Sequence, residues 1–286
     1  MPDATHATVT QSIAAGVAHV EIDRSETLNS LTREVFEDLV EVGLALRGNA
    51  EVRAVVLSGR GRAFSAGLDL GEFARIAEAG AGSAGESEAG AEVGAGSAVV
   101  LGERLGAARA LAQKAVHVWT LVDVPVIAAV NGAALGGGLQ IALGADLRIA
   151  HPDSQFAMME TRWGIIPDMC GTQILPRLVG PGMAKKLILT GSTIDGHEAL
   201  RVGLVEEIHV QPVERALELA TELAGRSRPA LASAKRLIDS SYEATLADGL
   251  DAEQEALAQL LGTDEQRQAV AAQLSRMRKR EARATR

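Results

Sequence analysis

The pattern of hydrophobic and polar positions predicts strands and helices in alternation. The stretches Thr8–Ile13 and Val17–Ile22 are rich in β-branched residues and flank a glycine, which predicts a β-hairpin. Residues 32–47 carry apolar side chains at helical spacing, after a threonine suited to the N-cap. The apolar run Ala54–Ser58 predicts a buried strand. Strands that alternate with helices are typical of an α/β domain with a largely parallel sheet.

The longest uncharged stretch is Val124–Ala145, with 22 positions. Its length would suffice for a membrane span, but the Asn131-Gly132 turn signal, the glycines Gly136–Gly138 and the polar Gln140 argue against one. We predict instead a buried strand, Val126–Val130, and a short buried helix with the glycines at its N-terminus. Backbone N–H groups there lack intrahelical partners, so they suit an anion or an oxygen that becomes negative during a reaction.

The rest of the chain divides by composition and periodicity. Residues 76–98 consist mainly of Gly, Ala, Ser and Glu, so we expect a mobile insertion that buries too little apolar surface to become ordered. Further elements are predicted as helices at 99–122, 182–189, 196–202 and from 212 onward, and as strands at 146–150, 155–158 and 204–210. These elements place an α/β core at residues 1–210 and a helical region at 211–286.

Composition narrows the class of protein. The chain has 286 residues, 47% of them hydrophobic, enough for one large core. A net charge of −9 argues against nucleic acid as the main partner. The single cysteine, Cys170, excludes an internal disulfide framework, and the histidines do not have a metal-binding spacing. The first residues lack the basic start and apolar run of a signal peptide, so a cytoplasmic location is expected.

Four motifs together resemble those of one enzyme family. They are the R-x-x-x-x-N pattern at Arg24–Asn29, AFSAGLDL at Ala63–Leu70, NGAALGGGLQIALGADLRIA at Asn131–Ala150 and ETRWGIIPDMCGTQILPRLVG at Glu160–Gly180. From about residue 8 to 240 the chain resembles the enoyl-CoA hydratase/isomerase family, also called the crotonase family. The resemblance implies a ββα spiral core and C-terminal helices that build a homotrimer or hexamer. It also implies an acyl-CoA thioester as substrate, no separate cofactor, and no nucleic-acid or membrane partner.

The resemblance assigns roles to backbone groups near the two glycine-rich loops. The family stabilises a thioester enolate in an oxyanion hole, whose two N–H donors correspond to Leu68 and Gly137. Leu68 stands where the family often has alanine, which we expect to narrow the pocket. The insertion at 76–98 corresponds to a segment near the substrate entrance, where a lid is an alternative to a plain flexible loop. Residues expected to bind substrate and CoA are Arg24, Ala66, Leu68, Asp69, Gly136, Gln140 and Trp163. For Arg24 the expected contact is with a CoA phosphate, and a plain surface arginine is an equal alternative.

Two carboxylates are candidates for proton transfer. Glu160 and Asp168 are separated by Gly164 and Pro167, so they lie on a loop rather than on one helix face. Apolar neighbours of Glu160 favour a raised pKa, which suits a general acid or base. From the residues alone, an exposed loop glutamate and a turn-forming aspartate are favoured over catalytic roles.

The resemblance separates two reactions. Family hydratases use two glutamates, at the positions of Gln140 and Glu160, and an amide cannot replace a carboxylate base. Family dienoyl-CoA isomerases have a carboxylate pair matching Glu160 and Asp168, although they usually have an aspartate at position 140. The pattern favours double-bond isomerisation of an enoyl- or dienoyl-CoA. The alternative is hydration of a 2-enoyl-CoA, as in fatty-acid oxidation, with Glu160 acting alone.

Two alternatives come from other functional classes. Ser65 lies in a sequence close to G-x-S-x-G, and Asp168 with His197 or His209 follows in the order of an α/β-hydrolase triad. The first glycine of that motif is missing, however, and labelling by a fluorophosphonate would discriminate this reading. A non-catalytic acyl-CoA binder is the other alternative, and it predicts tight CoA-ester binding without turnover.

Overall fold

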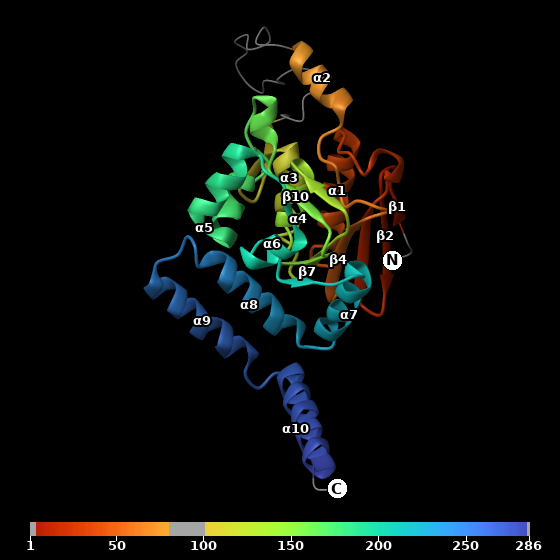
Figure 1. Ribbon diagram of the computed structural model, residues 1–286. Coiled ribbons are helices and arrows are strands. Elements are labelled where there is room, and N and C mark those ends of the chain that lie inside the picture. The colour runs from red at the N-terminus through yellow and green to blue at the C-terminus, as the bar shows by residue number, and fades with distance from the viewer. Residues whose placement is uncertain (1–3, 80–100, 285–286) are drawn as a thin grey trace.

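The computed structural model describes residues 4–79 and 101–284, and a twisted sheet lies at the centre of the molecule (Figure 1). Its seven strands have the order β1-β2-β3-β4-β7-β9-β12. The first three strands are antiparallel neighbours, and every pair from β3 to β12 is parallel. The predicted α/β class is therefore confirmed. The strands are β1 (Ala4–Thr5), β2 (Val9–Ala14), β3 (Val17–Ile22), β4 (Ala54–Gly59), β7 (Val126–Val130), β9 (Leu147–Ala150) and β12 (Glu207–Ile208).

The fully apolar strands of this sheet are covered on both faces. Along β4, Val55 and Leu57 belong to the larger hydrophobic core, whereas Ala54 and Val56 belong to a smaller one. Successive side chains of a strand point to opposite faces, so a continuous apolar run needs partners on both sides. The larger core lies under three helices: α1 (Arg33–Leu46), α3 (Leu111–His117) and α4 (Gly137–Leu143).

Helix α7 (Pro212–Ala224) covers the other face of the sheet. Its buried residues Ala216, Ala220 and Ala224 are four positions apart, so they lie on one side of the helix. Their small side chains let the helix approach the strands closely. The first helix beyond the predicted core boundary is thus packed against the sheet.

A second, smaller sheet includes the residues between strand β7 and the glycines at 136–138. It contains β8 (Ala133–Leu135), β10 (Gln155–Ala157) and β11 (Ile194–Asp195) in the order β11-β10-β8. Strand β8 lies between β7 and α4 in the chain, so its pairing with β10 fixes where α4 begins. Sequence analysis missed β8 because three residues are too short for a period-2 pattern.

Other elements agree with or correct the predictions downstream of residue 150. The predicted helix at 196–202 is α6 (Gly196–Arg201), and Asp195 caps it by accepting a hydrogen bond from the Glu198 N–H at 2.8 Å. The predicted helix 182–189 is the second half of α5 (Gly171–Thr190), which bends at Gly180. The predicted strand 204–210 is shorter, since β12 contains two residues.

The segment before the central stretch differs from the prediction. Residues 101–110 form a hairpin, β5 (Leu101–Leu105) and β6 (Ala108–Ala110), and helix α3 begins only at Leu111. The predicted helix over 99–122 was therefore too long at both ends, because a turn at residues 106–107 reverses the chain before α3 and residues 118–122 form turns and a bend after it. Of the predicted insertion, residues 76–79 belong to α2 (Leu70–Ala79), and 80–100 lie outside the described residues.

Three helices follow α7: α8 lies along the core, α9 lies beside α8, and α10 extends away from the rest of the molecule (Figure 1). They are α8 (Arg228–Ser240), α9 (Leu246–Leu260) and α10 (Asp264–Ala284). Helix α8 is amphipathic, yet it fully buries none of its residues within this chain. None of the helices in the described part of the chain combines the length and apolar character that a bilayer crossing requires.

Candidate active site

The loop after β4 is held by a buried asparagine. The Asn29 side chain accepts a hydrogen bond from the Arg24 N–H (2.8 Å) and donates to the carbonyl oxygens of Ala63 (2.8 Å) and Arg60 (3.0 Å). Asn29 has φ +56°, a left-handed conformation that asparagine tolerates better than most residues. The R-x-x-x-x-N pattern therefore fixes one backbone segment against another, and so positions residues 60–69.

This loop presents the backbone of Leu68. The Leu31 N–H donates to the Gly67 carbonyl at 2.8 Å, and the Asp69 N–H donates to the Leu31 carbonyl at 2.9 Å. These bonds use the groups on either side of Leu68 and form an isolated parallel bridge. Within the part of the chain that the structure describes, the Leu68 N–H has no hydrogen-bond partner. It is the kind of donor that a substrate oxygen can use.

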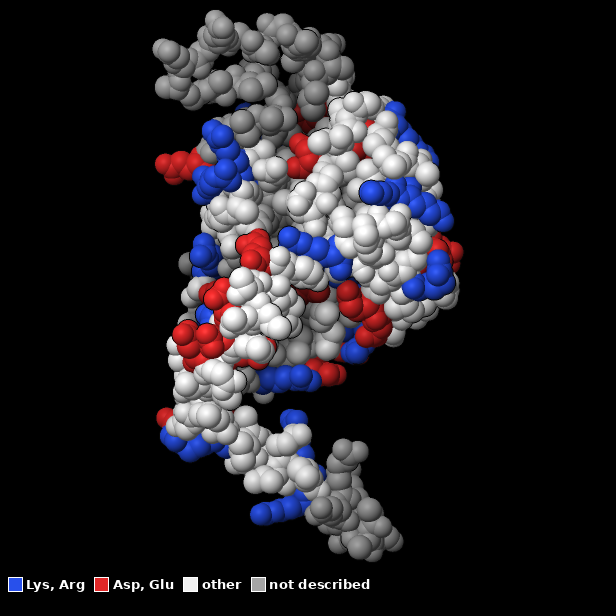
Figure 2. All heavy atoms as spheres, turned by 90° about the vertical axis from the view of Figure 1, so that its left-hand side faces the viewer, with Lys and Arg blue, Asp and Glu red and all other residues white. Residues whose placement is uncertain are grey.

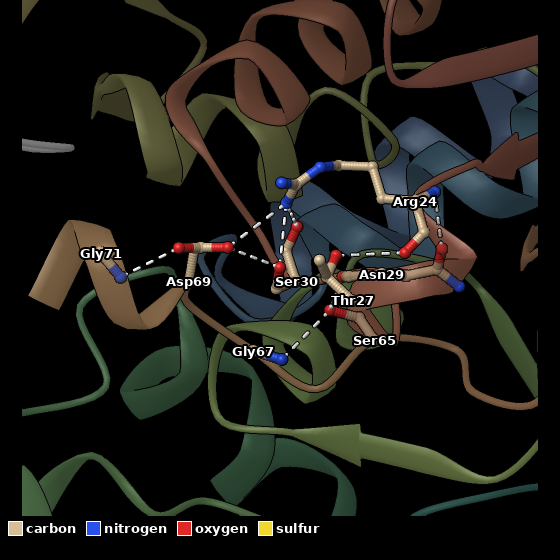
Figure 3. Close-up of polar contacts among 8 residues, drawn as sticks. All are labelled: Arg24, Thr27, Asn29, Ser30, Ser65, Gly67, Asp69 and Gly71. Carbon is tan, nitrogen blue, oxygen red and sulfur yellow. Dashed lines mark hydrogen bonds and ion pairs between the residues drawn. The ribbon is translucent and has the colours of Figure 1, made fainter.

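Arg24 and Asp69 meet at the outer side of this loop (Figure 3). The guanidinium donates to the Ser30 hydroxyl at 2.9 Å and lies 3.6 Å from an Asp69 carboxylate oxygen. Hydrogen bonds from the Ser30 hydroxyl and the Gly71 N–H, with the Arg24 charge, lower the pKa of Asp69. Arg24 is thus engaged within the protein, and its expected contact with CoA phosphate stays a prediction.

The second glycine-rich segment brings Gly137 beside the first. Gly136 has φ +50° and ψ −121°, a conformation open to glycine, and its N–H donates to the Ala157 carbonyl at 2.8 Å. Gly137 follows as the first residue of α4, and no described group accepts its N–H. A Cβ atom placed on Gly67 would lie 3.7 Å from the Gly137 nitrogen, so the two loops are in contact. The structure therefore brings both predicted donors together.

Glu160 lies next to these glycines. It begins the 3-10 helix η3 (Glu160–Trp163) and is only 6% exposed. A Cβ atom on Gly136 would lie 3.4 Å from Glu160 Oε1. That oxygen accepts a hydrogen bond from Gln140 Nε2 at 2.6 Å, whereas the buried Oε2 has no partner among the described residues.

The surroundings of Glu160 make it a basic carboxylate. Burial raises its pKa, the hydrogen bond from Gln140 opposes that shift, and the charge of Asp168 adds to it. A carboxylate with a raised pKa and a free lone pair is suited to general acid–base chemistry near neutral pH. The sequence-based expectation for the pKa of Glu160 is borne out.

Asp168 lies on the loop that leads into α5. The residue is exposed, but neighbouring protein atoms replace part of the water around its carboxyl group and raise its pKa. Its influence on Glu160 places the two carboxylates within electrostatic reach of each other. Burial and the Asp168 charge raise the pKa of Cys170 to about 11, so its thiol stays neutral and protonated.

Trp163 links η3 to α2 by an aromatic contact. Its ring is stacked on Phe73, with centroids 4.8 Å apart and planes inclined by 20°. Helix α2 begins two residues after Leu68, and η3 begins at Glu160, so the pair joins the two sides of the site. Phe73 was not predicted as a site residue, because nothing in the chain pattern shows that it meets an aromatic ring so far away in sequence.

The backbone N–H of Ala66 is bonded to the Leu28 carbonyl at 2.9 Å.

Ser65 is unsuited to nucleophilic catalysis. It is fully buried, its hydroxyl donates to the Asn29 carbonyl at 2.8 Å, and it accepts from the Gly67 N–H at 3.2 Å. A catalytic serine needs a hydroxyl that reaches the substrate and a base that accepts its proton. The triad alternative is therefore disfavoured. In the described ranges no group of three histidine, cysteine or carboxylate side chains is arranged to hold a metal ion.

Comparison with known proteins gives consistent matches over most of the chain. The sequence model of the enoyl-CoA hydratase/isomerase family matches residues 12–110 and 89–280. A short-chain-enoyl-CoA hydratase of Clostridium acetobutylicum is 35% identical over 260 residues, which is 90% of each chain. A crotonyl-CoA hydratase of Syntrophomonas wolfei is 36% identical over 211 residues, 73% of this chain and 71% of that one.

Solved structures agree with the sequence matches. The crystal structure of an enoyl-CoA hydratase from Bacillus anthracis aligns with a TM-score of 0.79 and 31% sequence identity, covering 94% of this chain and 96% of the other. The similarity therefore includes the α/β core and most of the C-terminal helices.

Proposed function

Because this chain belongs to the enoyl-CoA hydratase/isomerase family and has its crotonase-like fold, we propose that it moves a double bond in an enoyl- or dienoyl-CoA thioester. In this proposal Glu160 and Asp168 transfer protons at an enolate that the Leu68 and Gly137 N–H groups stabilise. The observation that carries the proposal is a carboxylate oxygen of Glu160 and two nearby backbone N–H groups that have no partner among the described residues.

The oxyanion hole lowers the energy of the enolate. When a carbon next to the thioester loses a proton, the electron pair moves towards the carbonyl oxygen, which becomes negative. Two preorganised N–H groups then bind that oxygen more strongly than the neutral carbonyl. Losing one such donor typically slows a reaction by about 10²–10³-fold.

Proton transfer uses the two carboxylates in turn. Glu160 Oε2 removes a proton from one carbon, and protonation at another carbon, assigned to Asp168, shifts the double bond without changing the mass. Both carboxyl groups have raised pKa values, which favours proton exchange near neutral pH. Between turnovers Asp168 regains a proton from the solvent to which it is exposed, and Glu160 releases the proton that it took from the substrate.

Hydration is the second candidate reaction. It is favoured by the names of the relatives from Clostridium acetobutylicum and Syntrophomonas wolfei, both hydratases. Against it, Gln140 stands where family hydratases have their first glutamate, and both ends of its amide are already hydrogen bonded. Hydration here would therefore depend on Glu160 without a second glutamate at position 140 to help activate water.

A panel of substrates decides between the two reactions. The purified protein is incubated with 2-enoyl-, 3-enoyl- and 3,5-dienoyl-CoA esters, and the products are identified by mass and ultraviolet absorbance. Isomerisation leaves the mass unchanged, whereas hydration adds one water. Asp168→Asn should impair isomerisation as severely as Glu160→Gln; a mild effect of Asp168→Asn together with water addition would favour hydration by Glu160 alone.

We further propose that the chain assembles into a trimer or hexamer through its C-terminal helices. The large apolar side chains Ile238, Leu246 and Leu250 are 65%, 80% and 51% exposed in the single chain. Figure 2 views the side of α5 and α9, where uncharged side chains form wide areas between separate groups of charged ones. Large apolar side chains this exposed on two consecutive helices are typical of a subunit interface.

A further inference from the structure

We propose that Gln140 is a positioning residue that selects Oε2 of Glu160 as the reacting oxygen and holds the loop carrying Asp168. The proposal rests on the proton-transfer role proposed for Glu160. Gln140 lies in the middle of α4 and is 1% exposed, so its side chain has only protein partners.

The orientation of the Gln140 amide is dictated by its backbone partners. Its Oε1 accepts hydrogen bonds from the N–H groups of Met169 (2.9 Å) and Gly171 (3.0 Å). Backbone N–H groups only donate, so the carbonyl end of the amide must face them and the NH₂ end must face Glu160. The 2.6 Å bond from Gln140 Nε2 to Glu160 Oε1 therefore has a fixed direction.

This direction makes the two oxygens of Glu160 unequal. Oε1 must remain an acceptor for the neutral amide whether Glu160 is ionised or protonated. A proton on Glu160 consequently sits on Oε2, the buried oxygen that has no other described partner. Gln140 thus directs proton exchange to one oxygen and restricts rotation of the carboxyl group.

The same side chain shapes the loop that carries Asp168. Met169 and Gly171, the two donors to Gln140, flank Cys170, whose φ of +69° is unusual for a residue with a side chain. A Cβ atom on Gly171 would lie 2.7 Å from Gln140 Oε1, so the loop packs directly on the amide. Removing the amide frees the loop next to Asp168 and the carboxyl group of Glu160 together.

A carboxylate at position 140 would change the acid–base behaviour of the site. In Gln140→Glu, the second carboxylate oxygen would replace the amide nitrogen and so would face Glu160 Oε1. Two carboxylates this close share one proton. With the neutral amide, Glu160 ionises without such a partner. Asp168 is the titratable group whose charge acts on Glu160, and the neighbouring Cys170 thiol stays neutral.

The test compares two variants at position 140 with a matched control. Gln140→Met keeps the chain length and removes all three hydrogen bonds. Gln140→Glu keeps an acceptor for the two backbone N–H groups, so the loop retains its anchor. The control is Gln113→Met, because Gln113 Oε1 also accepts from two backbone N–H groups, those of Arg109 and Ala110 at 3.1 Å. Gln113 touches the Asp168 loop through its backbone carbonyl, which lies 3.8 Å from Cys170 Sγ and which the substitution keeps.

Each variant is assayed over a pH range with a CoA ester that the unmodified enzyme converts. For Gln140→Met we expect kcat to fall about 10²-fold, the effect of misplacing a catalytic group by about 1 Å, with little change in KM. For Gln140→Glu we expect the acidic limb of the kcat profile to move upward by more than about one pH unit. Gln113→Met should lower the stability of the fold and leave kcat and its pH profile unchanged.

Two results would overturn this inference. One is a Gln140→Met enzyme with unchanged kcat; the other is a Gln140→Glu enzyme with an unchanged acidic limb, which is decisive even where Gln140→Met does not fold. The proposed function fails separately, through full activity of Glu160→Gln. If Glu160→Gln is inactive while both position-140 variants keep normal kcat and pH profiles, only the role of Gln140 is wrong.

Discussion

Replacing Gly67 by alanine tests whether the two glycine-rich loops form one oxyanion hole. Gly67 precedes Leu68 and has φ +92°, where L-residues are strained. An added Cβ atom would lie 2.6 Å from the Leu135 carbonyl oxygen, on the segment that leads to Gly137. The substitution therefore pushes the two predicted donors apart without altering a titratable group.

The size of the effect follows from these distances. Ordinary contact begins at 3.4 Å, so the loops must separate by up to 0.8 Å, which is 3.4 minus 2.6. A displacement of this order costs up to about 10²-fold in rate when it moves a catalytic group. The strain of positive φ costs about 1–2 kcal/mol, and the steric clash adds about 1–3 kcal/mol to the loss of stability.

The assay measures kcat and the urea dependence of unfolding for Gly67→Ala and for Gly48→Ala. Gly48 has a similar φ of +73°, but nothing lies within 4 Å of its added Cβ atom. Gly48→Ala should therefore lose about 1–2 kcal/mol of stability and keep its activity. Gly67→Ala should lose more stability and about 10–10²-fold in kcat. Equal kcat values in the two variants would refute the oxyanion-hole assignment to these loops.

Three further predictions concern stability and assembly. Burial raises the pKa of Glu160, so the ionised carboxylate destabilises the folded state above that pKa. Glu160→Gln should therefore raise the melting temperature at neutral pH. This gain in melting temperature should shrink as the pH falls through the raised pKa. The ammonium of the mostly buried Lys235 side chain lies 2.9 Å from Asp146 and donates to two backbone carbonyls, so Lys235→Met should cost about 3 kcal/mol in chemical denaturation. A loss below a few tenths of a kcal/mol would show that Lys235 does not anchor α8. Replacing the exposed Leu246 and Leu250 by aspartate should reduce the particle mass in light scattering without changing circular dichroism, whereas an unchanged mass would exclude α9 from the interface.

Patterns of hydrophobic residues located the strands that form the centre of the fold. Val126–Val130 was predicted with the bounds that β7 has, because the turn signals on either side of a short apolar run restrict where the strand can begin and end. The hairpin at 101–110 was missed because its pairing depends on a turn and on contacts with α3, which helical propensity does not reveal. Local pattern thus locates strong elements and fails where short ones depend on tertiary pairing.

The sequence predicted which residues belong to the candidate site, but not the hydrogen bonds between them. The motifs indicated Leu68, Gly137 and Glu160, and the structure brings their loops together. The sequence did not reveal that Gln140 bridges Glu160 to the backbone at Met169, since such a bond joins residues far apart in the chain.

Arg24 illustrates the same limit of sequence reasoning. Its motif suggested a contact with phosphate, whereas the structure gives its guanidinium partners in Ser30 and Asp69. Which partner a long charged side chain selects depends on the folded surroundings and cannot be read from spacing.

The most direct test of the account is the turnover of Glu160→Gln. Glutamine keeps the size of the side chain and an acceptor for Gln140, but it cannot take up a proton. The account predicts that kcat falls at least ~10²-fold for every enoyl-CoA ester that the enzyme converts, with nearly unchanged affinity for the ester. Near-normal turnover by a folded Glu160→Gln protein, whether as isomerase or hydratase, would contradict the assignment of this site.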